Sequence, residues 1–294
     1  SRPGQTQVPL CETIPVLETY TLPPERELSF DRAHLIKQII QASQEFGFFQ
    51  LINHGVSEKL THNVIDVGKE FFVLPAKDKA SLYSEDPKQK DTLRHPCHPL
   101  EEHNAILARK ATSLSVRKLS LWVLDLICEG LGLESRYLRE ELSQVQLMAI
   151  NHYPPCPDPS LTLGLPKHSD VNLITFLLQR ESHGLQVLKD GQWLAIEPLP
   201  NAFVVNVCHM LHIIRNGKLS SADHRVVTNK KIARTTVTSF IHPSNNCRIE
   251  PAKVLLSDYS PPLYRDFVYK DFLRTYMANT HNRVPPLEAY KIQN

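Results

Sequence analysis

The stretch KHSDVNLITFLLQ (residues 167–179) starts with a polar segment and continues as a β-branched and apolar run. It predicts a strand that begins near His168, because β-branched and aromatic residues favour strands. Side chains two positions apart on a strand point to the same face, so His168 and Asp170 can bind one metal ion together. His224, in SADHRVVTN (221–229) at the head of another predicted strand, can complete the set.

The segments around this stretch predict the fold. From Gln146 onward the pattern is one of successive strands without intervening helices: QLMAINHY (146–153), GLQVLKDGQWLAI (184–196) with a hairpin turn at Asp190-Gly191, NAFVVNV (201–207), HRVVT (224–228) and ARTTVTSFI (233–241). Such a succession favours an antiparallel jelly roll over a βαβ fold.

The first half of the chain is predicted to be mainly helical. Apolar spacing predicts helices at about 31–46, 57–74 and 113–129, with a buried strand at 48–53, and FVYKDFLRTYMANTH (267–281) predicts a closing helix. The predicted class is therefore mainly β with flanking helices: a double-stranded β-helix core, a helical N-terminal half and a C-terminal helix. We expect residues 1–112 to pack on a core of residues 113–294 as one cooperative unit.

The predicted ligand set has a specific chemistry. Two imidazoles and one carboxylate leave half of an octahedron open, which is typical of non-haem Fe(II) oxygenases. For the His-Ser-Asp triplet alone, a surface turn without function is the alternative.

Arg234 and Thr236, ten and twelve residues after His224, share one face of the strand ARTTVTSFI. A guanidinium group can bind a carboxylate through two parallel hydrogen bonds, and a hydroxyl group two residues on can add a third. An ordinary strand arginine paired with a surface acid is the alternative, but the position behind the His-Asp-His set favours an anion clamp.

Ordered blocks along most of the chain resemble the plant-type Fe(II)- and 2-oxoglutarate-dependent dioxygenases. They are IPVLETY (14–20), FGFFQLINHGVSEKL (46–60), KEFFVLPAKDKASLY (69–83), NHYPPCPDPSLTLGLPKHSDVNLITFLLQ (151–179), GLQVLKDGQWLAIEPLPNAFVVN (184–206), NGKLSSADHRVVTN (216–229) and RTTVTSF (234–240). Within the family the chain is most similar to the branch of specialised metabolism that holds hyoscyamine 6-hydroxylase-like and salicylate-hydroxylase-like enzymes.

The resemblance implies roles for individual residues. His168, Asp170 and His224 would bind Fe(II), and Arg234 and Thr236 would hold the distal carboxylate of 2-oxoglutarate. Thr236 stands where the family usually has serine. The resemblance also places Asn151 and Tyr153 beside the co-substrate, and Phe240 in the substrate pocket, while plain core packing is the alternative for Tyr153 and Phe240.

The implied reaction consumes O2 and 2-oxoglutarate, with ascorbate as reductant, and oxidises a small organic molecule while releasing succinate and CO2. Hydroxylation is the expected outcome. Desaturation, ring closure and demethylation share the same chemistry, and alkaloid, phenolic, flavonoid, terpenoid and coumarin substrates all stay open.

The chain departs from the family after the strand NAFVVNV. Asn206, Val207, Cys208 and His209 replace the usual Asn-apolar-Gly-Asp, so we expect the turn to differ or Cys208 to adopt an ordinary β or α conformation. His209 and the nearby His212 are expected in an exposed loop. Segments usual in the family are missing near residues 90–91 and 101–112, where loops could form lids over the pocket.

Composition excludes several classes of function. The net charge is only +2, with 22% charged and 41% hydrophobic residues. This balance gives no excess of positive charge that would bind nucleic acid or an anionic membrane. No apolar run approaches the roughly 20 residues that span a bilayer. Six scattered cysteines without a C-x-x-C pattern suggest free thiols in a reducing compartment. We therefore expect a cytoplasmic monomer.

Two alternatives remain at this stage. An oxidase of the amino-cyclopropane carboxylate type shares the barrel, the metal set and the arginine, but uses ascorbate in place of 2-oxoglutarate. A non-catalytic jelly-roll protein that binds a metabolite is the other.

Overall fold

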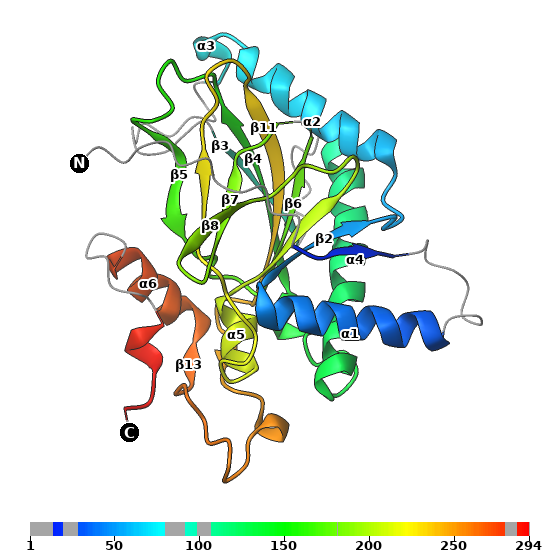
Figure 1. Cartoon of the computed structure of the whole chain (residues 1–294), viewed down its shortest axis with the longest axis vertical. Coiled ribbons are helices and arrows are strands. Elements are labelled where there is room, and N and C mark those ends of the chain that lie inside the picture. The colour runs from blue at the N-terminus through cyan, green and yellow to red at the C-terminus, as the bar shows by residue number, and fades with distance from the viewer. Residues whose placement is uncertain are drawn as a thin grey trace.

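The computed structural model describes residues 14–19, 29–79, 92–98, 107–180, 182–279 and 287–293. Within these residues, seven strands form a larger sheet in the order β1 (Val16–Glu18), β2 (Phe48–Ile52), β9 (Phe203–Val207), β6 (Ile174–Gln179), β11 (Arg234–His242), β4 (Val145–Tyr153) and β3 (Thr92–His98). A smaller sheet has the order β5 (Leu163–His168), β10 (His224–Val227), β7 (Leu185–Lys189) and β8 (Gln192–Ala195). The two sheets face one another and form the predicted jelly roll (Figure 1).

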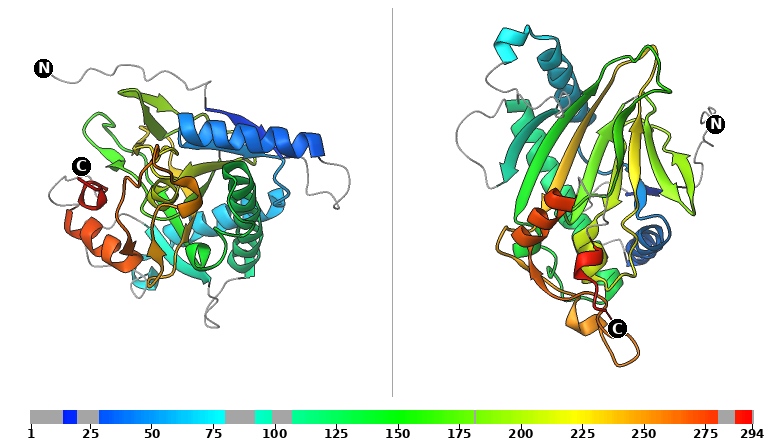
Figure 2. Two further views of the ribbon diagram at one scale, coloured as in Figure 1. Left: turned by 90° about the horizontal axis from the view of Figure 1, so that it is seen from below. Right: turned by 90° about the vertical axis from the view of Figure 1, so that its left-hand side faces the viewer.

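Helices cover the outer face of the larger sheet. They are α1 (Ser29–Glu45), α2 (Glu58–Val73) and α4 (Leu107–Leu131), and a short helix α3 (Ala76–Lys79) follows α2. Figure 2 shows α2 and α4 on the side of the larger sheet that faces away from the smaller one. At the other end of the chain, β12 (Arg248–Ile249) pairs with β13 (Phe267–Val268), and α6 (Tyr269–Asn279) follows directly.

The alternation of side chains along β11 explains why the larger sheet has two different faces. Val237 and Ile241 are buried in the core that the sheet shares with the helices. Arg234, Thr236 and Phe240 lie on the opposite face and line a cavity between the two sheets. One strand therefore supplies both packing residues and polar residues for a site.

A second hydrophobic cluster lies between the two sheets. Its members are Ile14, Phe48, Tyr153, Leu185, Val187, Ile196, Val204 and Val226. This cluster closes part of the barrel interior, so the polar groups that remain there are enclosed by apolar walls.

Most predicted elements are present, and the hairpin is where the turn chemistry predicts it. β7 and β8 pair across Asp190 and Gly191, whose φ angles are +49° and +78°. Both central residues are thus left-handed, as a type I′ turn requires.

The predicted start of the strand across 168–179 is wrong. β5 ends at His168 and β6 starts at Ile174, so Asp170 lies in the connecting loop and not two residues along one strand from His168. His168 still lies close to Asp170, because the chain turns between the two sheets at this point.

The N-terminal half is mixed, not simply helical. β1, β2 and β3 all belong to the larger sheet, and β3 was not predicted because Thr92–His98 carries a proline and polar residues in place of an apolar alternation. The segments expected as lids fall largely on residues 80–91 and 99–106, outside the described residues.

The histidines after β9 are not in an exposed loop. They belong to the short helix α5 (His209–Ile214), and His209 is only 4% exposed. Cys208, just before α5, has an extended backbone with φ −110°, which is the ordinary conformation expected for a residue that replaces glycine.

Two expectations from composition can be compared with the described residues. The five cysteines among them, Cys97, Cys128, Cys156, Cys208 and Cys247, are all free. None of the helices in these ranges combines the length and apolar character that a bilayer crossing requires.

Candidate active site

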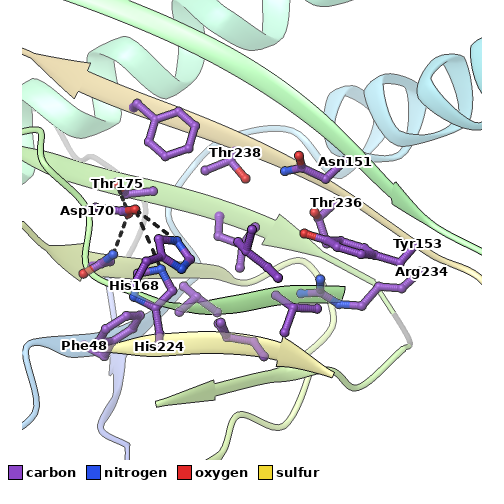
Figure 3. Close-up of a pocket in the computed structure, with 17 residues that line it drawn as sticks. Phe48, Asn151, Tyr153, His168, Asp170, Thr175, His224, Arg234, Thr236 and Thr238 are labelled. Carbon is purple, nitrogen blue, oxygen red and sulfur yellow. Dashed lines mark hydrogen bonds and ion pairs between the residues drawn. The ribbon is translucent and has the colours of Figure 1, made fainter. Parts of the chain in front are cut away.

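A cavity of about 500 Å³, including space that is open to solvent, lies between the two sheets. Figure 3 shows His168, Asp170 and His224 at one end of it and Arg234 and Tyr153 at the other. The cavity therefore joins the predicted metal set to the predicted anion clamp.

Three elements bring the metal set together. His168 is the last residue of β5, and His224, the first of β10, is its direct partner in the ladder. The ligand atoms of both histidines and of Asp170 lie within 4.8 Å of one another, and each histidine Nε2 is 3.7 Å from Asp170 Oδ1. These atoms face one common point, which is the geometry that a metal ion needs.

Backbone carbonyl groups orient the two imidazoles. His168 Nδ1 is 2.8 Å from the carbonyl oxygen of Pro166, and His224 Nδ1 is 3.3 Å from that of Ala222. A carbonyl can only accept, so Nδ1 carries the proton and Nε2 keeps its lone pair for a metal.

Burial and the neighbouring His168 lower the pKa of His224 to about 4, so that its imidazole is neutral at neutral pH. Burial alone would raise the pKa of Asp170. The electrostatic interactions with His224 and His168 and the hydrogen bond from Thr175 outweigh burial and lower this pKa. The set therefore combines a neutral His224 imidazole with an ionised Asp170 carboxylate, the forms that bind metals.

The second carboxylate oxygen of Asp170 is held by two residues that the sequence analysis did not assign to the site. Thr175 Oγ1, on β6, donates to Asp170 Oδ2 at 2.8 Å, and Asn206 Nδ2, on β9, donates to the same oxygen at 2.7 Å. Oδ1 is thereby left as the oxygen that faces the histidines. Only the alternation of ITFLLQ (174–179) and FVVNV (203–207) could have indicated that these side chains face inward.

Asp223 links the two segments that carry the metal set. Its carboxylate accepts hydrogen bonds from Ser169 Oγ at 2.5 Å and from Lys167 Nζ at 2.8 Å. Ser169 lies between His168 and Asp170, and Asp223 precedes His224. This contact holds the 167–170 segment against the start of β10.

At the far end of the cavity, Arg234 is a buried cation. It is 3% exposed, it forms no ion pair with a carboxylate of the described residues, and its Nε has no hydrogen-bond partner among them. Its Nη2 donates to Gln179 Oε1 at 2.9 Å, and its guanidinium lies over the ring of Tyr153, 5.4 Å from the centroid. The buried Nε2 of Gln179 is also without a partner in this part of the chain.

The other predicted residues of the clamp lie on the same face. In the β4–β11 ladder, Arg234 is opposite Tyr153 and Thr236 is opposite Asn151. Burial raises the pKa of the Tyr153 hydroxyl, so that it stays protonated and can donate. All four residues line the cavity, as does Phe240 further along β11.

The donor sets fit the implied groups. A buried guanidinium without a counter-ion is costly unless an anion joins it, and a carboxylate would also pair the free donors of Arg234 and Gln179. Two imidazoles and a monodentate carboxylate match the ligands of a non-haem Fe(II) centre. A jelly roll with this pair of sites defines the class of non-haem iron oxygenases.

Comparison with known proteins places the chain within that class. Residues 144–243 match the model of the 2OG-Fe(II) oxygenase superfamily, and residues 14–106 match the N-terminal model described as non-haem dioxygenase in morphine synthesis. The chain belongs to this superfamily and is an Fe(II)- and 2-oxoglutarate-dependent dioxygenase that uses O2.

Several plant enzymes are similar over nearly the whole chain. Hyoscyamine 6-dioxygenase of Hyoscyamus niger is 39% identical over 98% of this chain and 92% of its own length. Flavanone 3-dioxygenase 2 of Oryza sativa subsp. japonica is 38% identical over 89% and 85%, and the protein DOWNY MILDEW RESISTANCE 6 of Arabidopsis thaliana is 36% identical over 98% and 92%.

Solved structures agree with the fold. The crystal structure of JOX2 in complex with 2OG, Fe and JA superposes with a TM-score of 0.78 at 25% identity, over 95% of this chain and 89% of that one. The resemblance to the plant-type family that the sequence motifs indicate is thus confirmed.

Proposed function

We propose that the chain hydroxylates a small specialised metabolite, with succinate and CO2 as the products of the co-substrate. In this proposal His168, Asp170 and His224 hold Fe(II), and Arg234, Thr236, Asn151 and Tyr153 hold 2-oxoglutarate. Phe240 forms an aromatic wall for the substrate. When bound, the iron and the co-substrate supply the activation of O2 for oxidation of a substrate C–H bond.

One observation carries the proposal: an uncompensated buried cation and a three-ligand metal set share one cavity. Arg234 is 3% exposed without a carboxylate partner in the described chain, and its Nε is unpaired. A dicarboxylic acid whose far end pairs with Arg234 would reach along the cavity toward the metal set (Figure 3). A protein that merely binds a metabolite needs neither feature.

The residues around the cavity have distinct tasks. Thr175 and Asn206 fix the Asp170 carboxylate, and the carbonyl groups of Pro166 and Ala222 fix the two imidazoles. Apolar side chains between the two ends exclude water and strengthen the electrostatic contacts inside; these side chains are Leu165, Leu177, Leu185, Val204 and Val226.

Features of the whole chain support further proposals. We infer a cytoplasmic monomer that binds neither nucleic acid nor a membrane, on the basis of the net charge of +2 and the free cysteines. We also infer one cooperative unit from residues 1–112 and 113–294, since α4 crosses that boundary and one core cluster contains residues from Leu17 to Tyr290. Ascorbate would serve as reductant.

The test is turnover with plant metabolite extracts, Fe(II), ascorbate, O2 and 2-oxoglutarate, followed by mass spectrometry. We expect succinate in amounts matched to a product that is heavier by one oxygen atom. The His168→Ala variant serves as the control that lacks one metal ligand. Product formation without 2-oxoglutarate would favour an ascorbate-dependent oxidase, and metabolite binding without succinate would favour a non-catalytic protein.

A further inference from the structure

The first turn of α5 holds the loop that carries Asp170. The backbone N–H of His209 donates to the carbonyl oxygen of Asp170 at 3.0 Å, and the N–H of Met210 donates to the carbonyl oxygen of Asn172 at 3.1 Å. This loop connects β5 to β6 and belongs to neither strand. The position of the Asp170 backbone therefore depends on where α5 begins.

The side chain of His209 contacts the segment that carries His224. Its Nδ1 is 3.0 Å from Ser221 Oγ. Ser221 directly precedes Ala222, whose carbonyl oxygen is 3.3 Å from His224 Nδ1 and orients that imidazole. His209 thus touches Asp170 through its backbone and the His224 segment through its ring.

The surroundings of His209 hold its ring in place. The residue is only 4% exposed, and its ring meets the buried ring of Phe272 on α6 edge to face, with the two centroids 6.1 Å apart. Packing against Phe272 and the contact with Ser221 together restrict the imidazole to one orientation. A side chain that is fixed in this way can in turn fix the position of Ser221.

We infer that His209 is a positioning residue of the metal set. It joins the loop of Asp170 to the segment of His224 and so sets the spacing of these two ligands before a metal ion binds. His209 lies outside the group of side chains whose ligand atoms face one another. The inference rests on the proposed function, because it takes His168, Asp170 and His224 as the metal ligands.

A second link between the same segments limits the expected effect. The carboxylate of Asp223 accepts hydrogen bonds from Ser169 and Lys167 and does not involve α5. Loss of the His209 ring contact should therefore loosen the metal set without dismantling it. We expect metal affinity to fall by about tenfold, at the low end of the range for loss of a partner of a metal ligand.

Two variants of His209 separate the polar contact from the packing. His209→Phe keeps an aromatic ring beside Phe272 and loses Nδ1, whereas His209→Asn keeps a polar group near the position of Nδ1 and loses the ring. Competition with a chromogenic chelator measures the affinity for Co(II) or Zn(II), and thermal melting of the metal-free proteins measures folding. We expect His209→Phe to lose about tenfold in metal affinity. His209→Asn should keep most of this affinity although it shows the larger loss in melting temperature.

Ser221 gives an independent check of the same contact. Ser221→Ala should lower metal affinity by the same factor as His209→Phe. The double variant should bind no more weakly than either single variant, because each single substitution already removes the one contact that both residues share.

His54→Phe is the matched control. His54 is also 4% exposed, and its Nε2 is 2.8 Å from the carbonyl oxygen of Asn201, which belongs to neither segment of the metal set. This variant should lower the melting temperature and leave metal affinity unchanged.

His168→Ala separates this inference from the proposed function. Loss of metal binding in His168→Ala together with wild-type affinity in His209→Phe would overturn the inference alone. Additive losses in the double variant would also overturn it, as would affinities that follow the melting temperatures in every variant, His54→Phe included. If His168→Ala binds metal as tightly as the wild type, the assignment of the metal ligands fails, and the role of His209 fails with it.

Discussion

At the scale of single residues, the metal set depends on two side chains that lie outside the predicted ligand set. Thr175 and Asn206 both donate to Asp170 Oδ2, which leaves Oδ1 directed at the histidines. Their removal should let the carboxylate rotate and should weaken metal binding, as is usual when a partner of a metal ligand is lost.

We therefore expect Thr175→Val, which keeps the β-branched shape, to lower the affinity for Zn(II) or Co(II) by about 10- to 100-fold. Thr175→Ser should retain most of the affinity, and Asn206→Leu should behave like Thr175→Val. Competition with a chromogenic chelator measures this without any turnover, and thermal melting of the metal-free proteins controls for folding. Wild-type affinity in Thr175→Val would show that the hydrogen bond does not position Asp170.

Thr236 tests the co-substrate end. Its hydroxyl lines the cavity opposite Asn151, and we expect it to bind the same carboxylate as Arg234. Thr236→Val keeps the shape and loses only the polar group, so 2-oxoglutarate binding should weaken by roughly 1–3 kcal/mol. Thr236→Ser should bind 2-oxoglutarate nearly as tightly as the wild type. Titration of 2-oxoglutarate under argon with Fe(II) present measures binding alone. Equal affinities of the wild type, Thr236→Val and Thr236→Ser would mean that the Thr236 hydroxyl does not bind the co-substrate.

Single residues also show what sequence can and cannot predict about a site. His168, Asp170, His224 and Arg234 were predictable because their chemistry is specific and their spacing matches known motifs. Thr175 and Asn206 were not, because threonine and asparagine occur in many strands and only the packing of β6 beside β9 brings both to Asp170.

At the scale of elements, the strands after Gln146 were predictable because alternation and turn residues agree. The connection between β5 and β6 was not, since HSDVN leads into the apolar run LITFLLQ without a glycine or proline to mark a turn. Residues 169–173 leave the strand because Asn172, which is 1% exposed, donates to the carbonyl oxygen of Ile174 at 2.8 Å and so stabilises an irregular backbone.

The β7–β8 hairpin gives an element-scale prediction. Gly191 has φ +78°, and a Cβ atom there would meet no other atom within 4 Å. Any cost of Gly191→Ala must therefore come from the left-handed backbone, and we expect a loss of about 1–2 kcal/mol in the free energy of unfolding. Gly191→Asn should cost less, because asparagine tolerates this conformation. Denaturant unfolding measures both variants, and equal losses would mean that the side chain, not the backbone, is responsible.

At the scale of the whole molecule, buried histidines should make the stability depend on pH. Burial lowers the pKa of His209 and of His242 to about 4, whereas both titrate near 6.5 when unfolded. Between these values the unfolded chain binds more protons than the native one, so stability falls as the pH drops from about 6.5 toward 4. Each histidine contributes up to about 1.4 kcal/mol per pH unit in this window.

Denaturant unfolding of the metal-free protein between pH 6.5 and 4.5 measures this slope. His242→Asn should flatten it, since asparagine does not titrate. A slope that is identical in His242→Asn and wild type would contradict the neutral, buried state of His242.

The most direct test of the account is the binding of 2-oxoglutarate to the Fe(II)-loaded protein without O2, for wild type and for Arg234→Ala. The buried guanidinium has no other carboxylate partner in the described chain, so its loss should weaken binding by about 2–5 kcal/mol while Fe(II) affinity stays the same. Equal 2-oxoglutarate affinity in the two proteins would contradict the central claim that one cavity joins the metal set to a carboxylate clamp at Arg234.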